Sequence, residues 1–326
     1  MTKGGVARRT ARDHGSPLRH ARVRAFAKIN LDLRVLSKRP DGYHELRTIF
    51  QTVSLADNID IAFTPGRKTA IGLEDRLGIP DNLMVRAARL ALEAMGKTGR
   101  VSMRLEKHIP MGAGMGGGSS DAATVLLALP VLVGRRLELP NLIDIARQVG
   151  SDVPFFLVGG TAIGIGRGEE LFPLPDGAAR SGLIVAPGVH VNTAQAYRDL
   201  SPRLTSESQE NKIFSFQSQV WERGVGAPSV NDFETIVFEQ YPRLAEIKSR
   251  LIAAGASAAL MTGSGSAVFG LFPGRHAISA AARALEGERV IRISQVSRAR
   301  YRRTWWRALE EHIIGRTWPP QSRYAR

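Results

Sequence analysis

One stretch of sequence organises the chain: Pro110-Met111-Gly112-Ala113-Gly114-Met115-Gly116-Gly117-Gly118-Ser119-Ser120-Asp121, followed directly by the apolar run Ala122 to Leu129. Five of the eight residues from 111 to 118 are glycine. Glycine loses the most backbone entropy on ordering, so this segment should form neither a helix interior nor a strand. The last three residues of the stretch are types that cap helices, and a good helical sequence follows them. The stretch therefore predicts a glycine loop that leads into a capped helix over 119–133, which Pro130 should kink or end early.

A loop of this kind presents unpaired backbone N–H groups beside the positive end of a helix dipole, an arrangement that binds phosphate. Gly112, Gly114 and Gly117 also fit the dinucleotide pattern G-x-G-x-x-G, but that pattern alone is weak. Residues 101–109 alternate apolar and polar types, as in a half-exposed strand, whereas a dinucleotide fold needs a continuously apolar strand there. No Gly-Lys-Ser/Thr follows the loop, so it is not a Walker sequence. A flexible linker would not run straight into a helix cap, and we interpret the stretch as a phosphate-binding loop.

The composition is that of a soluble globular protein, with 43% hydrophobic and 23% charged residues. A length of 326 residues favours two packed domains plus tails. No apolar run approaches the roughly 20 residues that span a bilayer, and the start lacks an apolar signal core. The absence of cysteine excludes disulfides and thiolate metal sites. Together these features favour a cytoplasmic protein without a membrane segment.

The net charge of +15 is concentrated at the two ends of the chain. Residues 1–24 and residues 297–326 each carry a net charge of +6, so the body is only mildly basic, as suits an enzyme with anionic substrates. We predict that the arm 1–24 is disordered, although an RNA-contacting arm or a mitochondrial targeting segment would have a similar composition. In the tail 297–326, Trp305, Leu309 and Ile313 have helical spacing and predict a short docked helix. Alternatively, its tryptophans and arginines could stack on single-stranded nucleic acid.

Three further places along the chain carry candidate functional side chains. A strand over 23–35 would place Lys28 and Asn30 on one polar face. The turn Pro40-Asp41-Gly42 projects Tyr43 and His44 together, which suits a planar base or, alternatively, a turn aromatic packed on the core. Asp152 lies between the end of a helix over 139–149 and an apolar segment read as a strand, where it could be a poorly hydrated functional carboxylate or simply a turn cap.

The remaining elements follow from periodicity and end signals. Thr48–Leu55 and Ile59–Phe63 read as two strands, and Asn82 should cap a helix over 83–95 that Gly96 ends. After a composition shift near residue 173 come a buried strand at 183–185, a short helix that contains Thr193 and Tyr197, and a long surface loop over 200–228. Helices and strands then alternate from Asn231 to Ser294 as an α+β module.

At this point the motifs match one known superfamily. Ala27-Lys28-Ile29-Asn30 with Pro40-Asp41-Gly42-Tyr43-His44-Glu45-Leu46, the loop Pro110–Asp121, and Thr262-Gly263-Ser264-Gly265-Ser266 resemble the GHMP kinases. More narrowly, the chain resembles the family of GHMP kinases that act on 4-diphosphocytidyl-2-C-methyl-D-erythritol in the non-mevalonate route to isoprenoid precursors. The resemblance covers about residues 25–294, and neither tail belongs to it.

The resemblance implies an α+β fold of two domains with the active site between them. Residues 25–172 would form a ribosomal-S5-like ATP-binding domain with a left-handed βαβ-type core, and residues 173–296 a ferredoxin-like domain. With Mg²⁺ as cofactor, ATP would donate its γ-phosphoryl group to the 2-hydroxyl of the methylerythritol unit.

The resemblance also assigns roles to residues of this chain. Asp152 would be the catalytic base and Lys28 its partner at the transferring phosphate. The loop Pro110–Ser120 would hold the ATP phosphates, with Ser119 and Ser120 nearest Mg²⁺ and Asn82 near the nucleoside. On the acceptor side, Tyr43 and Tyr197 would sandwich the cytosine and His44 would read its edge. Asn30 and Thr193 would line the substrate cleft.

Two alternatives remain open from the sequence. Another GHMP kinase, for homoserine or a mevalonate-pathway substrate, would share the loop but would not need an aromatic cytosine site. A non-catalytic protein of this fold could contact nucleic acid through its basic tails, although the presence of both Lys28 and Asp152 beside an intact loop argues against it. The sequence leaves open whether the protein is a monomer or a homodimer.

Overall fold

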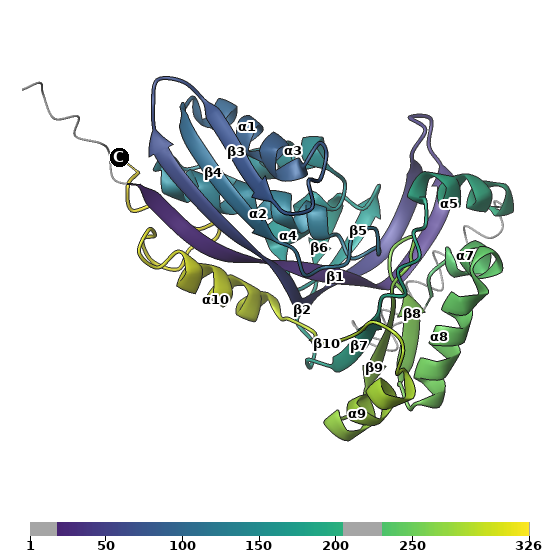
Figure 1. Ribbon diagram of the computed structural model, residues 1–326. Coiled ribbons are helices and arrows are strands. Elements are labelled where there is room, and N and C mark those ends of the chain that lie inside the picture. Colours follow the sequence, from purple (N-terminus) through teal and green to yellow (C-terminus); the bar gives the residue numbers. More distant parts are fainter. Residues whose placement is uncertain (1–17, 205–229, 326) are drawn as a thin grey trace, which may run out of the picture.

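The computed structural model describes residues 18–204 and 230–325 (Figure 1). The predicted disorder of residues 1–17 and most of the predicted loop over 200–228 lie outside the described residues. Two units lie side by side, and one long pair of strands runs from the first unit to the second (Figure 1). Within the described part, no helix is long and apolar enough to cross a membrane.

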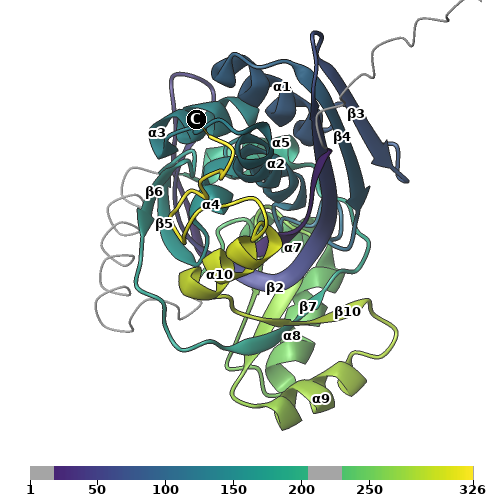
Figure 2. The same cartoon turned by 90° about the vertical axis from the view of Figure 1, so that its left-hand side faces the viewer.

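The N-terminal unit is a six-stranded sheet covered by four helices (Figures 1 and 2). Its strands are β1 (Arg19–Lys38), β2 (His44–Pro65), β3 (Ala70–Asp75), β4 (Gly99–Glu106), β5 (Thr161–Gly166) and β6 (Glu170–Pro173). The order is β3-β4-β2-β5-β6, with β1 paired to β2. The helices are α1 (Leu83–Met95), α2 (Gly117–Val133), α3 (Leu139–Val149) and α4 (Val153–Val158). Their apolar faces and one face of the sheet form the larger core, around α2, which is buried from Ser120 to Val133.

The C-terminal unit is a four-stranded antiparallel sheet with helices on it. Its elements are β7 (Ser181–Val185), α5 (Thr193–Leu200), α7 (Glu234–Gln240), α8 (Pro242–Ala253), β8 (Ala258–Met261), β9 (Val268–Phe272), α9 (Arg275–Ala284) and β10 (Val290–Ser294). The strand order β10-β7-β9-β8 places the last strand beside the first and the third beside the second, as in a ferredoxin-like sheet. The two-domain α+β architecture expected from the resemblance is therefore confirmed.

The long pair β1–β2 differs from the sequence-based expectation. The two predicted strands Thr48–Leu55 and Ile59–Phe63 are one strand, because Asp57 between them is buried and accepts hydrogen bonds from His108 N and Ile109 N. β1 begins at Arg19, so the end of the predicted disordered arm is ordered. There the exposed Arg22 and Arg24 alternate with the buried Ala21 and Val23, a strand pattern hidden within a basic segment.

Two helix predictions hold and two features near them were wrong. Helix α1 covers 83–95 and α3 covers 139–149, as expected. The predicted cap at 119–121 is wrong, because α2 begins two residues earlier, after a left-handed Gly116. Pro130 does not end α2 early: the helix continues to Val133, where packing of a buried apolar helix outweighs the lost hydrogen bond. The apolar segment after Asp152 is the helix α4 rather than a strand.

The C-terminal tail forms a docked helix, α10 (Arg298–Ala308), that packs on the N-terminal unit, but this helix ends before Leu309 and Ile313, which the prediction had placed on it. Figure 2 shows it beside α4, although the whole C-terminal unit separates these elements in the sequence. Trp305 and Leu309 are buried in the larger core, with exposures of 1% and 0%. The tail is thus an integral layer of the first unit.

We expect the substitution Trp305→Ala to lower the free energy of unfolding by about 3–5 kcal/mol, because it empties a large buried site. The measurement is denaturant unfolding, with the exposed Arg303→Ala on the same helix as the control. A loss below about 1 kcal/mol, the range of surface substitutions, would show that the tail is not part of the core.

Candidate functional site

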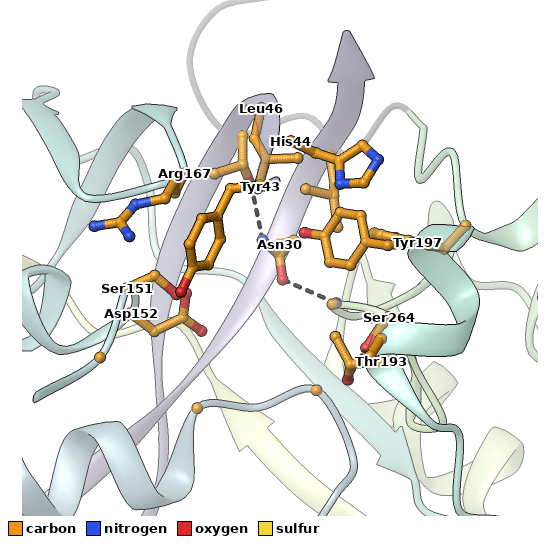
Figure 3. A pocket seen from close by; sticks show the side chains of 18 of the residues that line it. Asn30, Tyr43, His44, Leu46, Ser151, Asp152, Arg167, Thr193, Tyr197 and Ser264 are labelled. Atoms are coloured by element: carbon orange, nitrogen blue, oxygen red, sulfur yellow. Dashed lines mark hydrogen bonds between the residues drawn. The ribbon is translucent and has the colours of Figure 1, made fainter. Parts of the chain in front are cut away.

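A cavity of about 820 Å³ lies between the two units. Its lining comes from β1, β2, the glycine loop, the start of α4, and α5 (Figure 3). It brings together seven residues that the sequence singled out: Lys28, Asn30, Tyr43, His44, Asp152, Thr193 and Tyr197. The structure therefore gathers both predicted catalytic residues and all the predicted acceptor-site residues in one place.

The two predicted catalytic residues form an ion pair. Lys28 Nζ lies 3.4 Å from Asp152 Oδ2, and the lysine side chain is only 4% exposed whereas the aspartate is 30% exposed. Asp152 precedes the first residue of α4, but its carboxylate caps none of the described N–H groups of that helix. The carboxylate is consequently oriented by the lysine and open to the cavity.

Asn30 holds this lysine rather than offering free atoms to a ligand. Its Oδ1 accepts hydrogen bonds from Lys28 Nζ at 2.8 Å and from Gly263 N at 2.9 Å. Its Nδ2 donates to Thr48 Oγ1 at 2.7 Å. Asn30 lines the cavity as predicted, but both ends of its amide are used within the protein, so the geometry favours orientation of Lys28.

The glycine loop meets the C-terminal unit backbone against backbone. A Cβ at Gly114 would lie 2.0 Å from Thr262 O, and a Cβ at Gly263 would lie 2.9 Å from Gly114 Cα. Both glycines have left-handed backbones, with φ of 75° and 60°. The Thr-Gly-Ser-Gly-Ser block is therefore the part of the second unit that holds the loop.

A second cavity of about 390 Å³ lies on the other side of the loop. It is lined by Asn82, Lys107 and the loop from Pro110 to Ser119, and it shares Gly114, Gly116 and Ser119 with the first cavity. The first N–H groups of α2 have no partner within the helix and are placed at this junction. Asn82 uses its side-chain oxygen to cap α1, accepting from Met84 N at 3.0 Å. An extended ligand could thus run from one cavity to the other past Ser119.

The two serines that were predicted to bind the metal lie in different environments. Ser119 lies at the junction of the two cavities, whereas Ser120 is 1% exposed and outside the lining of both. Among residues 18–204 and 230–325, no cluster of three or more His, Cys, Asp or Glu could hold a metal by itself. A Cβ at Gly118 would meet nothing nearer than 3.9 Å, so the loop leaves open space there.

A buried charge network that we did not predict lies under the loop. Lys107 Nζ contacts Asp57 Oδ2 at 2.5 Å and Asp121 Oδ2 at 2.7 Å. Burial alone would lower the pKa of Lys107, but the two carboxylates outweigh it and raise this pKa. Burial is the main cause that raises the pKa of Asp121, and the negative charge of the neighbouring Asp57 adds to it. Together they outweigh the attraction of Lys107 and bring this pKa to about 7. The network ties the start of α2 to β2. The only sequence signal was that Lys107 and Asp121 flank the loop.

Aromatic side chains gather at the far end of the larger cavity. The rings of His44 and Tyr197 stack with centroids 4.7 Å apart, and His44 Nε2 lies 2.6 Å from Ser201 Oγ. Burial, followed by the charge of Lys38, lowers the pKa of His44, so the imidazole is neutral at neutral pH. Tyr43 is 55% exposed on the opposite side of the pocket (Figure 3), with the Arg167 guanidinium 4.6 Å from its ring centroid. Arg167 was not among the predicted site residues.

Comparisons with known proteins agree with this geometry. The family models for the GHMP kinases N terminal domain and the GHMP kinases C terminal match residues 82–160 and 220–291. A 4-diphosphocytidyl-2-C-methyl-D-erythritol kinase from Solibacter usitatus (strain Ellin6076) is 66% identical over 313 residues, covering 95% of this chain and 99% of the relative.

Solved structures give the same picture. A crystal structure of 4-(cytidine 5'-diphospho)-2C-methyl-D-erythritol kinase superposes with a TM-score of 0.70 at 39% identity, covering 84% of this chain and 98% of that one. A homoserine kinase from Cytophaga hutchinsonii has a TM-score of 0.64 at 17% identity, covering 90% of this chain and 98% of that one. The second likeness shows the fold alone.

The contact between the glycine turns predicts that Gly114→Ala destabilises the protein. A left-handed backbone costs a residue with a Cβ about 1–2 kcal/mol, and the clash with Thr262 O adds to this. Gly118→Ala in the same loop, where the added Cβ meets open space, is the matched control for thermal unfolding. Equal melting temperatures for the two variants would contradict the backbone contact.

Proposed function

The chain belongs to the 4-diphosphocytidyl-2-C-methyl-D-erythritol kinase family of the GHMP kinases, and we propose that the cavity between its two units phosphorylates the 2-hydroxyl group of that substrate. It is an ATP-dependent small-molecule kinase. The observation that carries the proposal for the site is the shape of the larger cavity. It holds the Lys28–Asp152 pair between a cluster of aromatic rings and the phosphate loop.

The two cavities divide the substrates between them. ATP fits the smaller cavity, with its nucleoside near Asn82 and its phosphates on the loop and the first N–H groups of α2. The acceptor fits the larger cavity, with the 2-hydroxyl beside Asp152. Ser119 lies where the cavities meet, which is the position for the γ-phosphoryl group.

Phosphoryl transfer needs alignment and charge neutralisation more than covalent help from the protein. Asp152 accepts the proton of the 2-hydroxyl as that oxygen forms a bond to the γ-phosphorus, and the bond from this phosphorus to the departing ADP oxygen breaks. Lys28, held by Asn30 at 2.8 Å, brings a buried positive charge to the transferring group.

Ser119 is the loop hydroxyl that lines both cavities and would hold Mg²⁺, which would neutralise phosphate charge when bound with ATP. The burial of Ser120 supports its removal from the set of metal residues that the sequence suggested.

The aromatic cluster explains the choice of acceptor. Tyr43 and Tyr197 offer ring faces on two sides of the pocket. His44 Nε2 is bonded to Ser201 Oγ, which itself donates to Tyr197 O, so the neutral His44 offers Nδ1 as an acceptor to the edge of a base. Homoserine and mevalonate have no base to fill this space, so the cluster favours the cytidine-bearing substrate. The cytoplasmic location and the oligomeric state remain predictions from the sequence.

The test of the function is ATP-dependent phosphorylation of 4-diphosphocytidyl-2-C-methyl-D-erythritol, with homoserine and mevalonate as alternative acceptors. We expect turnover of the cytidylyl substrate alone. Turnover of either other acceptor at a comparable kcat/KM would contradict the role of the aromatic cluster.

The role of Asp152 is tested with Asp152→Asn. We expect kcat to fall by about 10²–10⁴-fold, the usual contribution of a general base, while the melting temperature changes little. Asp144→Asn, a carboxylate on the exposed face of α3, is the matched control and should keep full activity. Retention of turnover by Asp152→Asn would remove it as the base.

The substitution Tyr43→Ala tests the binding of the acceptor separately from the chemical step. Loss of base stacking in Tyr43→Ala should weaken acceptor binding by about 1–3 kcal/mol and raise the KM of the cytidylyl substrate accordingly. The KM of ATP should not change, because Tyr43 lies in the other cavity. An unchanged KM for the cytidylyl substrate would show that the exposed ring does not contact the base.

A further inference from the structure

We propose that the C-terminal segment 297–325 is a positioning clamp for the active site. It binds the C-terminal ends of α4 and α2, the two helices whose N-terminal ends carry Asp152 and the phosphate loop. The segment contributes no lining to either cavity, so it acts through these helices. This inference rests on the proposed function, because it takes Asp152 as the base.

The clamp on α4 consists of two hydrogen bonds to its last turn. Tyr301 donates its hydroxyl to Phe156 O at 2.5 Å, and Trp318 Nε1 donates to Leu157 O at 2.9 Å. The last carbonyl groups of a helix have no partner within the helix. α4 has only six residues, and these bonds fix its last turn in addition to the packing of its buried side chains.

The residues that follow α4 make close contacts with the tail. A Cβ at Gly159 would lie 2.5 Å from the Tyr301 ring, and a Cβ at Gly160 would lie 2.7 Å from Arg298 Cβ. Arg298 also donates through Nη2 to Thr161 O at 2.5 Å and through Nη1 to Leu174 O at 3.0 Å. The tail therefore packs closely against the residues that follow α4. A loosely associated extension would not make such close contacts.

The same segment reaches the far end of α2. Ser322 Oγ donates to Val131 O at 2.6 Å, and Arg19 Nη1 donates to Leu132 O at 2.7 Å. The Arg19 guanidinium stacks on the ring of Tyr324 at 3.9 Å, so the tail also holds this second donor. Both helices that meet at the site are therefore held at their opposite ends by one segment.

A short rigid helix transmits this restraint. α4 is about 9 Å long at 1.5 Å per residue, so a small shift of its last turn, at Phe156 or Leu157, is passed along this short helix to Asp152 at its other end. Asp152 must stay near both Lys28 and the acceptor hydroxyl, and a misplacement of 1 Å can cost about a hundredfold in rate. We expect loss of the clamp to lower kcat and to leave the aromatic binding pocket unchanged.

The experiment compares Tyr301→Phe and Trp318→Phe with Trp306→Phe in the full chain. The first two each remove a hydrogen bond to α4 and keep an aromatic ring. Trp306 Nε1 donates to Thr317 O at 3.0 Å within the tail itself, so its substitution is matched in chemistry but does not touch α4. Steady-state kinetics with 4-diphosphocytidyl-2-C-methyl-D-erythritol and ATP are measured well below each melting temperature, together with amide hydrogen exchange of residues 153–158.

In Tyr301→Phe and Trp318→Phe, we expect kcat to fall by about tenfold, within the range set by small misplacements. The KM of the cytidylyl substrate should be unchanged, and exchange across α4 should accelerate. Trp306→Phe should behave like the unmodified protein in all three readouts. An unchanged kcat in both clamp variants, or an equal fall in Trp306→Phe, would overturn the proposal. Retained turnover in Asp152→Asn would instead remove the proposed base, and faster exchange in α4 would still report the clamp itself.

Discussion

The structure depends on one close approach, in which the backbone of the phosphate loop touches the backbone of the Thr-Gly-Ser-Gly-Ser turn. Gly114 and Gly263 meet without side chains between them, and a Cβ at either position would lie within 3 Å of a backbone atom of the opposite segment. Because this contact joins the two units at the loop, it places one cavity on each side of the same few residues. A transferring group can therefore pass between two binding spaces without leaving the loop.

The two buried lysines beside the loop have different electrostatic settings. Lys107 lies between two carboxylates, so the surrounding protein already neutralises its charge. Lys28 has a single carboxylate, Asp152, at 3.4 Å, and this carboxylate is partly exposed to the cavity. The setting of Lys28 agrees with its proposed role at the phosphoryl group, while Lys107 links β2 to the start of α2 beneath the loop. Leaving Lys107 buried without its two carboxylates would be strongly destabilising.

Local sequence signals were enough to predict the loop, α1 and α3, whereas the pairing of Lys28 with Asp152 was implied only by the family resemblance. Lys28 and Asn30 alternate along one strand, and the Pro-Asp-Gly turn projects Tyr43 and His44, so these positions follow from short-range geometry. The break that we predicted between two strands at Asp57 was wrong, because the burial of this carboxylate is compensated by Lys107 and by backbone N–H groups some fifty residues away. The supposed caps at 119–121 failed for the same reason: Asp121 serves the buried network, and a left-handed glycine begins the helix. Such long-range pairs leave no local pattern.

The basic tails illustrate why the net charge of a segment does not identify its binding partner. The tail arginines and tryptophans suggested nucleic-acid binding by composition, but several of them are used inside the fold. Arg298 donates to strand carbonyls, Arg302 lies 5.2 Å from the centroid of the Trp318 ring, and Trp305 is buried in the core. A guanidinium has five donors in a fixed planar arrangement, which suits it to binding carbonyl groups at the ends of helices and strands. In this chain much of the tail's basic and aromatic character therefore serves to attach the tail to the N-terminal unit.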